Sequence, residues 1–395
     1  MGRWTNAALG LGLGAALVGA TSGEARACGM MIFTEHAARS GGMNRQEIFV
    51  NFGEATTTMI VSAAFVDESG DLAFVLPLIA PPATVVDGDV SLFLALERGT
   101  APRVTIDDAS DEGGGCSPIK AGGDLGGGES EVTVFGRGMT ETYTYLIVGG
   151  DTGIAITEWL ASAGLDVPPE VSGALQPYID QGWVFLAAEV RPDAPSGDLA
   201  PLEISLPAAT PDSFKIPFGI AAASLPPDQP LEVALYVASD AMVLPGNYEG
   251  AEIDPDAVEA ISPESSNFAA LFAEASAGGK MVLEYSSDGW EPTYLGSWYA
   301  GDELEGPASG GDPAWLDDFA IRVGGGPRRL SRFRGVLGAD ELKDMTFTMT
   351  TPHDVSSSYA VTYKEGGCRI GGGGWPALLL VMAAPLIARR RRRRP

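Results

Sequence analysis

The sequence predicts an α+β fold that is predominantly antiparallel β, with a helical hairpin and a few short helices. Three observations support this prediction. Hydrophobic residues make up 45% of the 395 residues, enough for a sizeable core. Stretches rich in Val, Ile, Phe and Thr alternate with turns along the chain. Two apolar stretches with helical spacing, separated by Pro168 and Pro169, indicate the hairpin.

The first strands are expected after residue 45. Residues 46–52, 57–65 and 71–77 show partial alternation of apolar and polar side chains between short turns, which predicts an antiparallel meander. Residues 92–98 have a helical apolar pattern, and Gly99 is expected to end that helix.

The middle and the end of the chain supply the remaining elements. Residues 132–148 have strand composition, and helices at 157–163 and from Pro168 onward form the predicted hairpin. Further strands are expected at residues 183–190, 202–206, 214–223, 231–238, 280–285, 320–323 and 346–350. Short helices are expected at residues 267–275 and 339–345, with the segment 328–337 before the latter.

The composition shifts along the chain predict five parts. They are a signal peptide (1–27), an N-terminal mostly β domain (28–150) with an acidic glycine-rich loop at 107–131, an α+β domain (151–352), a linker with Cys368 (353–374), and a C-terminal hydrophobic sorting segment with an arginine cluster (375–395).

The N-terminus has the organisation of a secretory signal. Arg3 precedes an apolar run at residues 7–20, and the small residues Ala25 and Ala27 come just before Cys28. The run is too short for a membrane span, which needs about 20 apolar residues. We therefore expect cleavage after Ala27 and export of the rest of the chain.

The C-terminus combines four features in a fixed order. Cys368 precedes a glycine run at 371–374 and an apolar stretch at 375–388. The cluster that follows consists of Arg389, Arg390, Arg391, Arg392, Arg393 and Arg394. Arginines cross a bilayer at high cost, so this cluster is expected to remain cytoplasmic as a stop signal.

This tail resembles the myxobacterial C-terminal sorting signals. The resemblance implies that Cys368 is the processing and lipid-attachment site, and that the residues after it are removed. A plain stop-transfer anchor is the alternative interpretation.

The exported body is more acidic than the whole chain. Without the two end segments, 17 basic and 51 acidic groups remain in residues 28–388, a formal charge of −34. A surface of this charge repels nucleic acid, so we expect no nucleic-acid partner. It also favours a soluble, monomeric state.

Three cysteines occur in the chain. With Cys368 assigned to the tail, Cys28 and Cys116 form an even pair in an oxidising compartment, where a disulfide is the expected state. A lipidated Cys28 with a free Cys116 is the alternative.

Residues with catalytic or metal-binding potential are scarce. His36 and His353 lie far apart and outside any metal motif, and the chain contains no Gly-x-Ser-x-Gly element. The acidic loop at 107–131 has oxygen ligands that suit calcium, but it lacks the helix-loop-helix spacing, so a solvated loop is the other interpretation. We predict no catalytic residue, no metal ligand and no cofactor.

Aromatic residues are concentrated between residues 290 and 315. They are Trp290, Tyr294, Trp298, Tyr299 and Trp315. Rings near glycines are common in binding surfaces and also in ordinary cores, so both interpretations stand.

Six stretches occur in an order similar to that of a bacterial family catalogued as domain of unknown function 2330. They are residues 27–29, 72–77 with Pro81 and Pro82, 96–103, 158–169, 175–183 and 328–345. The likeness covers most of residues 28–350. The family has no established activity, so the resemblance implies no chemistry.

Together these observations predict an exported protein that is anchored at the cell envelope, at the outer surface. We expect a non-catalytic role in envelope structure, adhesion or recognition. The alternative is an extracytoplasmic hydrolase that uses paired carboxylates. The partners implied by the two end segments are a signal peptidase, a sorting protease and the envelope membrane; the sequence identifies no final ligand.

Overall fold

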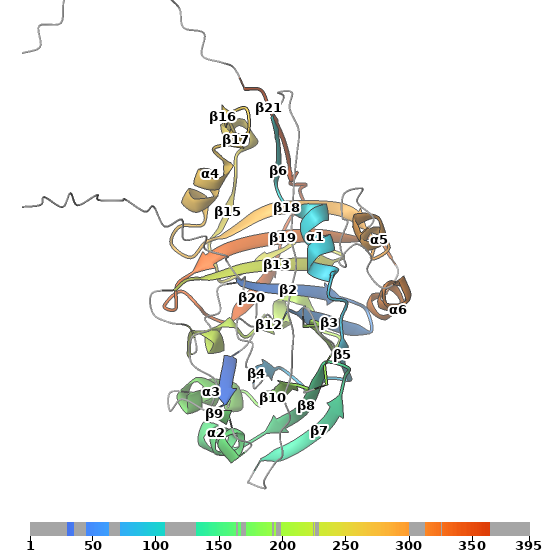
Figure 1. Cartoon of the computed structure of the whole chain (residues 1–395), viewed down its shortest axis with the longest axis vertical. Coiled ribbons are helices and arrows are strands. Elements are labelled where there is room, and N and C mark those ends of the chain that lie inside the picture. The colour runs from blue at the N-terminus through green and yellow to red at the C-terminus, as the bar shows by residue number, and fades with distance from the viewer. Residues whose placement is uncertain are drawn as a thin grey trace, which may run out of the picture.

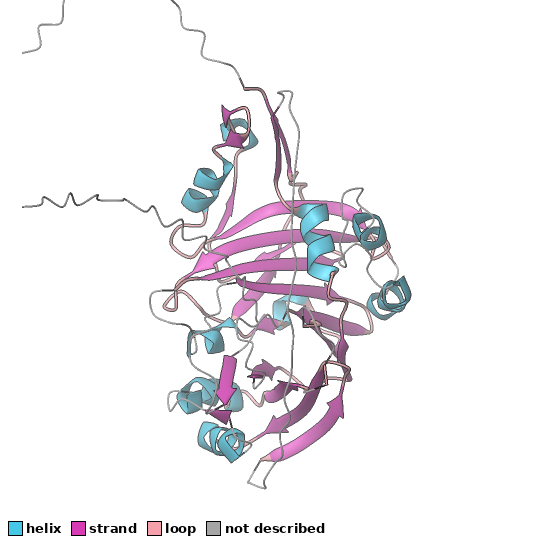
Figure 2. Ribbon diagram, in the orientation of Figure 1, coloured by secondary structure: helices cyan, strands magenta, loops and turns pink. Residues whose placement is uncertain are grey.

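The computed structural model contains two large β-sheets, helices on their outer faces and three smaller sheets (Figures 1 and 2). The structure describes residues 30–363 except 35–44, 63–71, 107–131, 163–164, 167–170, 192, 195–198, 224, 226–228, 300–312 and 325. The predicted α+β class with mostly antiparallel strands is confirmed.

The larger sheet has eight strands and crosses the middle of the molecule (Figure 1). In order across the sheet they are β15 (Gly250–Glu252), β18 (Met281–Trp290), β19 (Arg328–Leu337), β13 (Leu231–Ser239), β2 (Arg45–Phe52), β3 (Thr56–Val61), β11 (Leu202–Pro207) and β5 (Thr84–Asp87). The pairs β13–β2 and β15–β18 are parallel, and the others are antiparallel.

The second sheet has six strands, all paired antiparallel. Their order is β7 (Thr133–Met139), β8 (Tyr143–Gly149), β10 (Val184–Val190), β4 (Leu72–Leu78), β1 (Met30–Thr34) and β9 (Leu165–Asp166). Both large sheets therefore combine strands from before and after residue 150.

The smaller sheets lie around these two. They are β12 (Lys215–Ile216), β20 (Met345–Met349) and β14 (Val243–Pro245); β16 (Ala260–Ser262) and β17 (Ser265–Ser266); and the parallel pair β6 (Arg103–Ile106) and β21 (Ser358–Val361). Short 3-10 helices occupy Pro211–Ser213, Phe218–Ala223 and Pro255–Ala257.

Six α-helices complete the described part of the chain. They are α1 (Leu92–Thr100), α2 (Gly153–Ser162), α3 (Val171–Ile179), α4 (Phe268–Ala275), α5 (Tyr294–Tyr299) and α6 (Pro313–Val323). The predicted hairpin is confirmed as α2 and α3, which pack on the outer face of the six-stranded sheet. None of these helices is long and apolar enough to cross a membrane.

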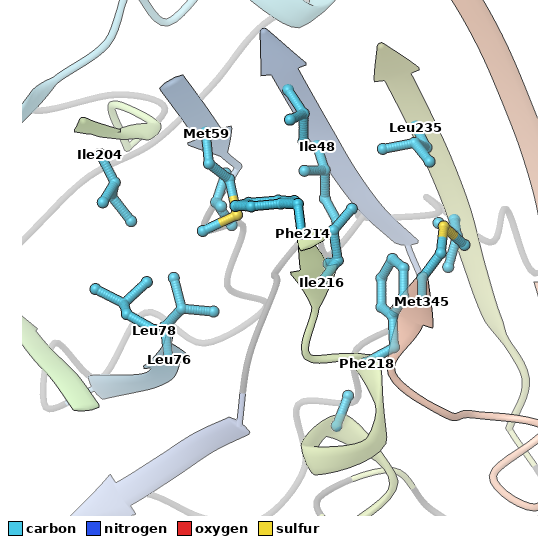
Figure 3. Close-up of a cluster of buried hydrophobic side chains, with 14 of the residues drawn as sticks. Ile48, Met59, Leu76, Leu78, Ile204, Phe214, Ile216, Phe218, Leu235 and Met345 are labelled. Carbon is cyan, nitrogen blue, oxygen red and sulfur yellow. The ribbon is translucent and has the colours of Figure 1, made fainter. Parts of the chain in front are cut away.

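The main core lies between the two large sheets. Alternate side chains of β2, such as Ile48, point inward and belong to the same apolar cluster as Leu76 and Leu78 of β4, and Phe214 and Ile216 are part of this cluster (Figure 3). The side chains of each strand alternate between the two faces of its sheet. One face is buried in this core, and helices pack on the other.

Two strand predictions are wrong. β4 does not continue a meander with β2 and β3, because it pairs with β10 and β1 in the other sheet. Alternation fixes which residues share a face but not which sheet a strand joins. Residues 320–323 belong to α6, because Trp315, Phe319 and Val323 follow a four-residue spacing and face the apolar cluster on the eight-stranded sheet.

Residues 214–223 and 339–345 also differ from their predictions. The first segment has only a two-residue strand, β12, which ends at Ile216, just before Pro217 and a 3-10 helix. The second begins with a turn in which Gly338 N donates to Glu341 Oε2 at 2.8 Å. Residues 342–344 form neither helix nor strand, and Asp344 Oδ1 accepts a hydrogen bond from Tyr178 Oη at 2.6 Å.

Helix α1 continues through Gly99 instead of ending there. A Cβ atom at this position would lie 2.2 Å from Trp298 Cδ2 of α5. Gly99 is therefore needed for close packing of an aromatic ring on the helix, not for a left-handed turn.

Candidate functional site

Charged side chains gather on the outer face of the eight-stranded sheet. We call this group the ionic band, and its members are Arg45, Glu47, Glu97, Glu232, Glu284, Arg332 and Arg334. Three arginines and four glutamates make its formal charge −1. Charges buried to this degree are expensive unless each is paired, so their arrangement needs an explanation.

The strands position these residues through their register. Ala234 of β13 lies between Glu47 of β2 and Arg334 of β19, and its small side chain leaves room for the longer ones. On β18 a register shift occurs at Glu284, which has no direct partner in the pairing with β19. A shift of this kind re-aims a side chain, and here Glu284 reaches two arginines.

Arg332 lies at the centre of the band and is 1% exposed. Its Nη2 lies 2.9 Å from Glu97 Oε2, and its Nε lies 3.1 Å from Glu284 Oε2. The guanidinium also lies over the ring of Tyr236, 5.6 Å from the centroid. One cation thus bridges a helix carboxylate and a strand carboxylate.

Glu97 connects α1 to the sheet. Besides Arg332, its Oε2 contacts Arg45 Nη2 at 3.1 Å and accepts a hydrogen bond from Tyr236 Oη at 3.1 Å. Arg45 Nη2 in turn lies 2.9 Å from Glu47 Oε1. Charge-assisted contacts therefore hold the helix to three strands, β19, β2 and β13.

Arg334 completes the band on its other side. Its Nη2 and Nε lie 2.8 and 2.9 Å from Glu284 Oε1, and its Nη1 lies 3.6 Å from Glu232 Oε1. Its guanidinium carbon lies 3.7 Å from the ring centroid of Phe272 on α4. The band therefore separates the apolar cluster under α1 from the one under α4.

The two carboxyls on Arg332 have pKa values shifted in opposite directions. For Glu97, burial alone raises the pKa, but the charges of Arg332 and Arg45 outweigh it and hold the pKa below its usual value. For Glu284, burial is the dominant cause and raises the pKa in spite of Arg332 and Arg334. Such a separation of pKa values is typical of acid and base pairs in active sites.

Access decides what this pair can do chemically. The Glu284 side chain has no exposed surface, whereas the Glu97 side chain is 34% exposed. A general acid must reach the proton acceptor within hydrogen-bonding distance. Glu284 is enclosed by guanidinium groups, so the band acts as a fixed set of charges that fastens α1 to the sheet.

Comparison with known proteins gives a family but no activity. The family described as "Uncharacterized protein conserved in bacteria (DUF2330)" matches residues 22–322. The chain belongs to this family. No curated protein matches it.

Solved structures of a baculovirus protein are similar to this DUF2330 chain at a low level. The crystal structure of baculovirus P35 has 10% identity and a TM-score of 0.34, covering 80% of this chain and 98% of that one. The crystal structure of a mutated P35 after caspase cleavage has 10% identity and a TM-score of 0.34, covering 78% of this chain and 98% of that one. The crystal structure of the caspase-8/P35 complex has 10% identity and a TM-score of 0.33, covering 78% of this chain and 97% of that one.

Most of the residues considered as candidate sites in the sequence of this DUF2330 protein lie outside the described residues. These are Cys28, Cys116, Cys368, His36, the acidic loop at 107–131 and the arginines at 389–394. His353 is described and exposed, with its Nε2 2.8 Å from Glu252 Oε1. The described residues hold no group of three or more His, Cys, Asp or Glu that is placed to bind a metal.

The aromatic residues between 290 and 315 divide between the two interpretations. Trp290 is buried in the apolar cluster under α1, and Trp298 and Trp315 pack against it. Trp315 stacks on Phe319, with the ring centroids 4.6 Å apart. Tyr294 is 46% exposed, and the Tyr299 side chain is not among those described. Core packing therefore accounts for the three tryptophans.

No member of the ionic band was predicted from the sequence. The available signal was period-two placement of charge within strands, as in Arg45 and Glu47 or Arg332 and Arg334. Such alternation is also the pattern of an ordinary strand with one solvated face. These charges are buried and not solvated because α1 packs over them, and the sequence pattern of the strands does not reveal that packing.

Proposed function

We propose that this DUF2330 protein is exported, anchored at the cell envelope through Cys368, and used there for adhesion, recognition or envelope structure without catalysis. The sequence basis is the pair of end segments, a removable leader and a cysteine-glycine-apolar-arginine tail. The observation that carries the proposal is the position of β21, the last described strand before that tail.

Strand β21 lies at one end of the long axis of the molecule, paired with β6 (Figure 1). Tyr363 is the last described residue, five positions before Cys368. The six-stranded sheet with β7 lies at the opposite end of that axis (Figure 1). A tether at Cys368 would hold the body by one end and present the six-stranded sheet away from the membrane.

The ionic band supports a non-catalytic role over the hydrolase alternative. Its carboxyl with the raised pKa, Glu284, contacts Arg332 and Arg334 and has no exposed surface. A glycosidase pair needs two carboxyls that flank a substrate bond. The convergent carboxylates of this face are instead occupied by arginines of the same sheet.

Export also supports the proposed disulfide between Cys28 and Cys116. Peptide mass analysis of native protein, with thiols blocked before digestion, should detect the two cysteines in one linked pair that reductant separates. Recovery of both as blocked thiols, or of Cys28 with a lipid mass, would refute the disulfide. These outcomes leave the anchoring proposal intact, because Cys368 is not involved.

The anchoring proposal is tested by fractionating cells that express the full chain and analysing its C-terminal peptide by mass spectrometry. We expect the product in the envelope fraction, with a modified peptide that ends at Cys368. Cys368→Ser should abolish that modification, whereas the matched variant Cys116→Ser should retain it. Unprocessed chain in the cytosol would overturn the proposal, and so would a retained arginine tail in the envelope.

A further inference from the structure

Residues 355–361, which end in β21, lie on the surface of the body just before the end of the described chain (Figure 1). We call this segment the strap. Along it, exposed residues alternate with partly buried ones, and Tyr359 is its one buried side chain, with 6% of its surface exposed. A segment that buries so little apolar surface is weakly held and opens more easily than the core.

Backbone hydrogen bonds join the strap to two separate strands. Val355 exchanges two of them with Ser286 of β18, with N–O distances of 2.9 and 3.0 Å. Ser357 O accepts a hydrogen bond from Arg103 N at 2.6 Å, and β21 then pairs with β6 in parallel over four residues. Among the described strands, β6 and β21 pair only with each other. A ladder of two short strands is marginally stable by itself.

Tyr359 supplies most of the apolar contact between the strap and the body. Its ring centroid lies 5.3 Å from that of Phe268 on α4, and the ring belongs to the apolar cluster under that helix. Attachment of the whole strap therefore depends on one aromatic side chain together with the short backbone ladders.

The chain is held more firmly immediately before the strap. Arg329 of β19 is 7% exposed, and its Nη1 donates to His353 O at 3.0 Å and to Asp354 Oδ1 at 2.8 Å. We call these contacts the clamp. Before the clamp, Thr350 N donates to Met242 O at 2.9 Å. Hydrogen bonds from a guanidinium are charge-assisted and stronger than the neutral bonds of the strap, so opening that begins at the strap is expected to stop at the clamp.

We propose that the strap detaches from the body as one unit, up to the clamp, and reattaches while the body stays folded. With the strap attached, five residues lead from Tyr363 to Cys368. With the strap detached, the fourteen residues 355–368 are free. At about 3.3 Å per residue, the greatest reach of the tether rises from about 17 Å to about 46 Å.

The consequence for anchoring rests on the proposed function, whereas detachment is a property of the chain in solution. The attached strap holds the body by one end of its long axis, because β21 lies there (Figure 1). The detached strap leaves the body tethered at the clamp and free to turn. A pull on the body acts first on β21, the described strand nearest to Cys368. The strap is thus spare tether length that is released under load.

The test is hydrogen exchange of the full chain in detergent, resolved to single amides by fragmentation in the mass spectrometer. The reporters are the amides of Arg103, Ser286 and Val355, which bond across the strap. We expect one common opening constant for the three, at least about a hundredfold larger than for the amides of β13, and slow exchange at Thr350. Reporters as slow as β13, or three different opening constants, would overturn the proposal.

Tyr359→Ser tests the residue that holds the strap. Removing the buried ring should raise the opening constant of the three reporters at least about tenfold and together, with β13 unchanged. The control Tyr294→Ser changes a 46% exposed tyrosine on α5 and should leave all of these rates unchanged.

Two outcomes of this substitution contradict the proposal. Faster exchange at Val355 with Arg103 unchanged means that the strap does not move as a unit. An equal rise in the strap and in β13 means that the strap opens only when the body unfolds. Anchoring at Cys368 is tested by cell fractionation and not by exchange, so failure of one proposal is distinguishable from failure of the other.

Discussion

Replacing Arg332 by Met should destabilise the protein more than the loss of any exposed ion pair. The substitution keeps much of the apolar stem over Tyr236 but removes the cation between Glu97 and Glu284. Removing one member of a buried ion pair costs about 3–5 kcal/mol. Glu284 retains Arg334 at 2.8 Å and Glu97 retains Arg45 at 3.1 Å, so we expect the lower end, about 3 kcal/mol.

Urea unfolding of the full chain at pH 7, followed by tryptophan fluorescence, measures this loss. Lys280→Met is the matched control, because Lys280 lies 2.7 Å from a Glu249 that is 70% exposed, and its loss should cost less than about 1 kcal/mol. Adding Glu284→Gln to Arg332→Met should recover part of the deficit through a coupling of about 1 kcal/mol or more. An Arg332→Met deficit as small as that of the control would refute the role given to the band.

Three further predictions concern residues that hold helices to the sheet. Arg322→Ala should lower the free energy of unfolding in urea by about 3 kcal/mol, because it leaves the carboxylate of Glu203 buried without its cation. Glu203 is 1% exposed, and its carboxylate oxygens lie 2.6 and 2.8 Å from Arg322 Nε and Nη2. A loss below about 1 kcal/mol would contradict this. Gly99→Ala should destabilise by about 1–2 kcal/mol through its clash with Trp298, whereas the control Gly173→Ala, with open space around it, should stabilise. Glu97→Gln and Glu284→Gln should show opposite pH dependence in unfolding free energy. The lowered pKa of Glu97 contributes stability that is present above pH 4.5 and is lost as the pH falls. The loss of unfolding free energy in Glu97→Gln therefore becomes smaller in acid. The raised pKa of Glu284 contributes stability that is present below pH 4.5 and is lost as the pH rises above that value. The Glu284→Gln variant therefore gains on wild type as the pH rises, and a parallel response of the two variants would refute the assignment.

Features that depend on local pattern could be predicted from the sequence. The hairpin α2–α3 follows from apolar spacing around Pro168 and Pro169, and α4 from the spacing of Phe268, Leu271 and Phe272. Both are settled by residues close together in the chain. Strand residues were also mostly located correctly, because alternation is a local property too.

Features that depend on partners distant in sequence could not be predicted. The parallel pairing of β2 with β13, and the antiparallel pairing of β4 with β10 instead of β3, join segments separated by more than a hundred residues. The ionic band adds a second difficulty, since Glu97 comes from a helix and its contacts Arg45 and Arg332 from two strands. No spacing in the sequence relates these three residues.

The ionic band also gives the eight-stranded sheet a reason for its register. A slip of β2 by one residue would turn Arg45 and Glu47 into the apolar core between the sheets and bring Ile48 to the arginines of β19. Unpaired charges in such a core cost several kcal/mol each. Because β13 is parallel to β2, no hairpin turn connects the two strands and fixes their register. The charged side chains of the ionic band fix it instead. The same charges that hold α1 to the sheet therefore also disfavour a slipped register of β2.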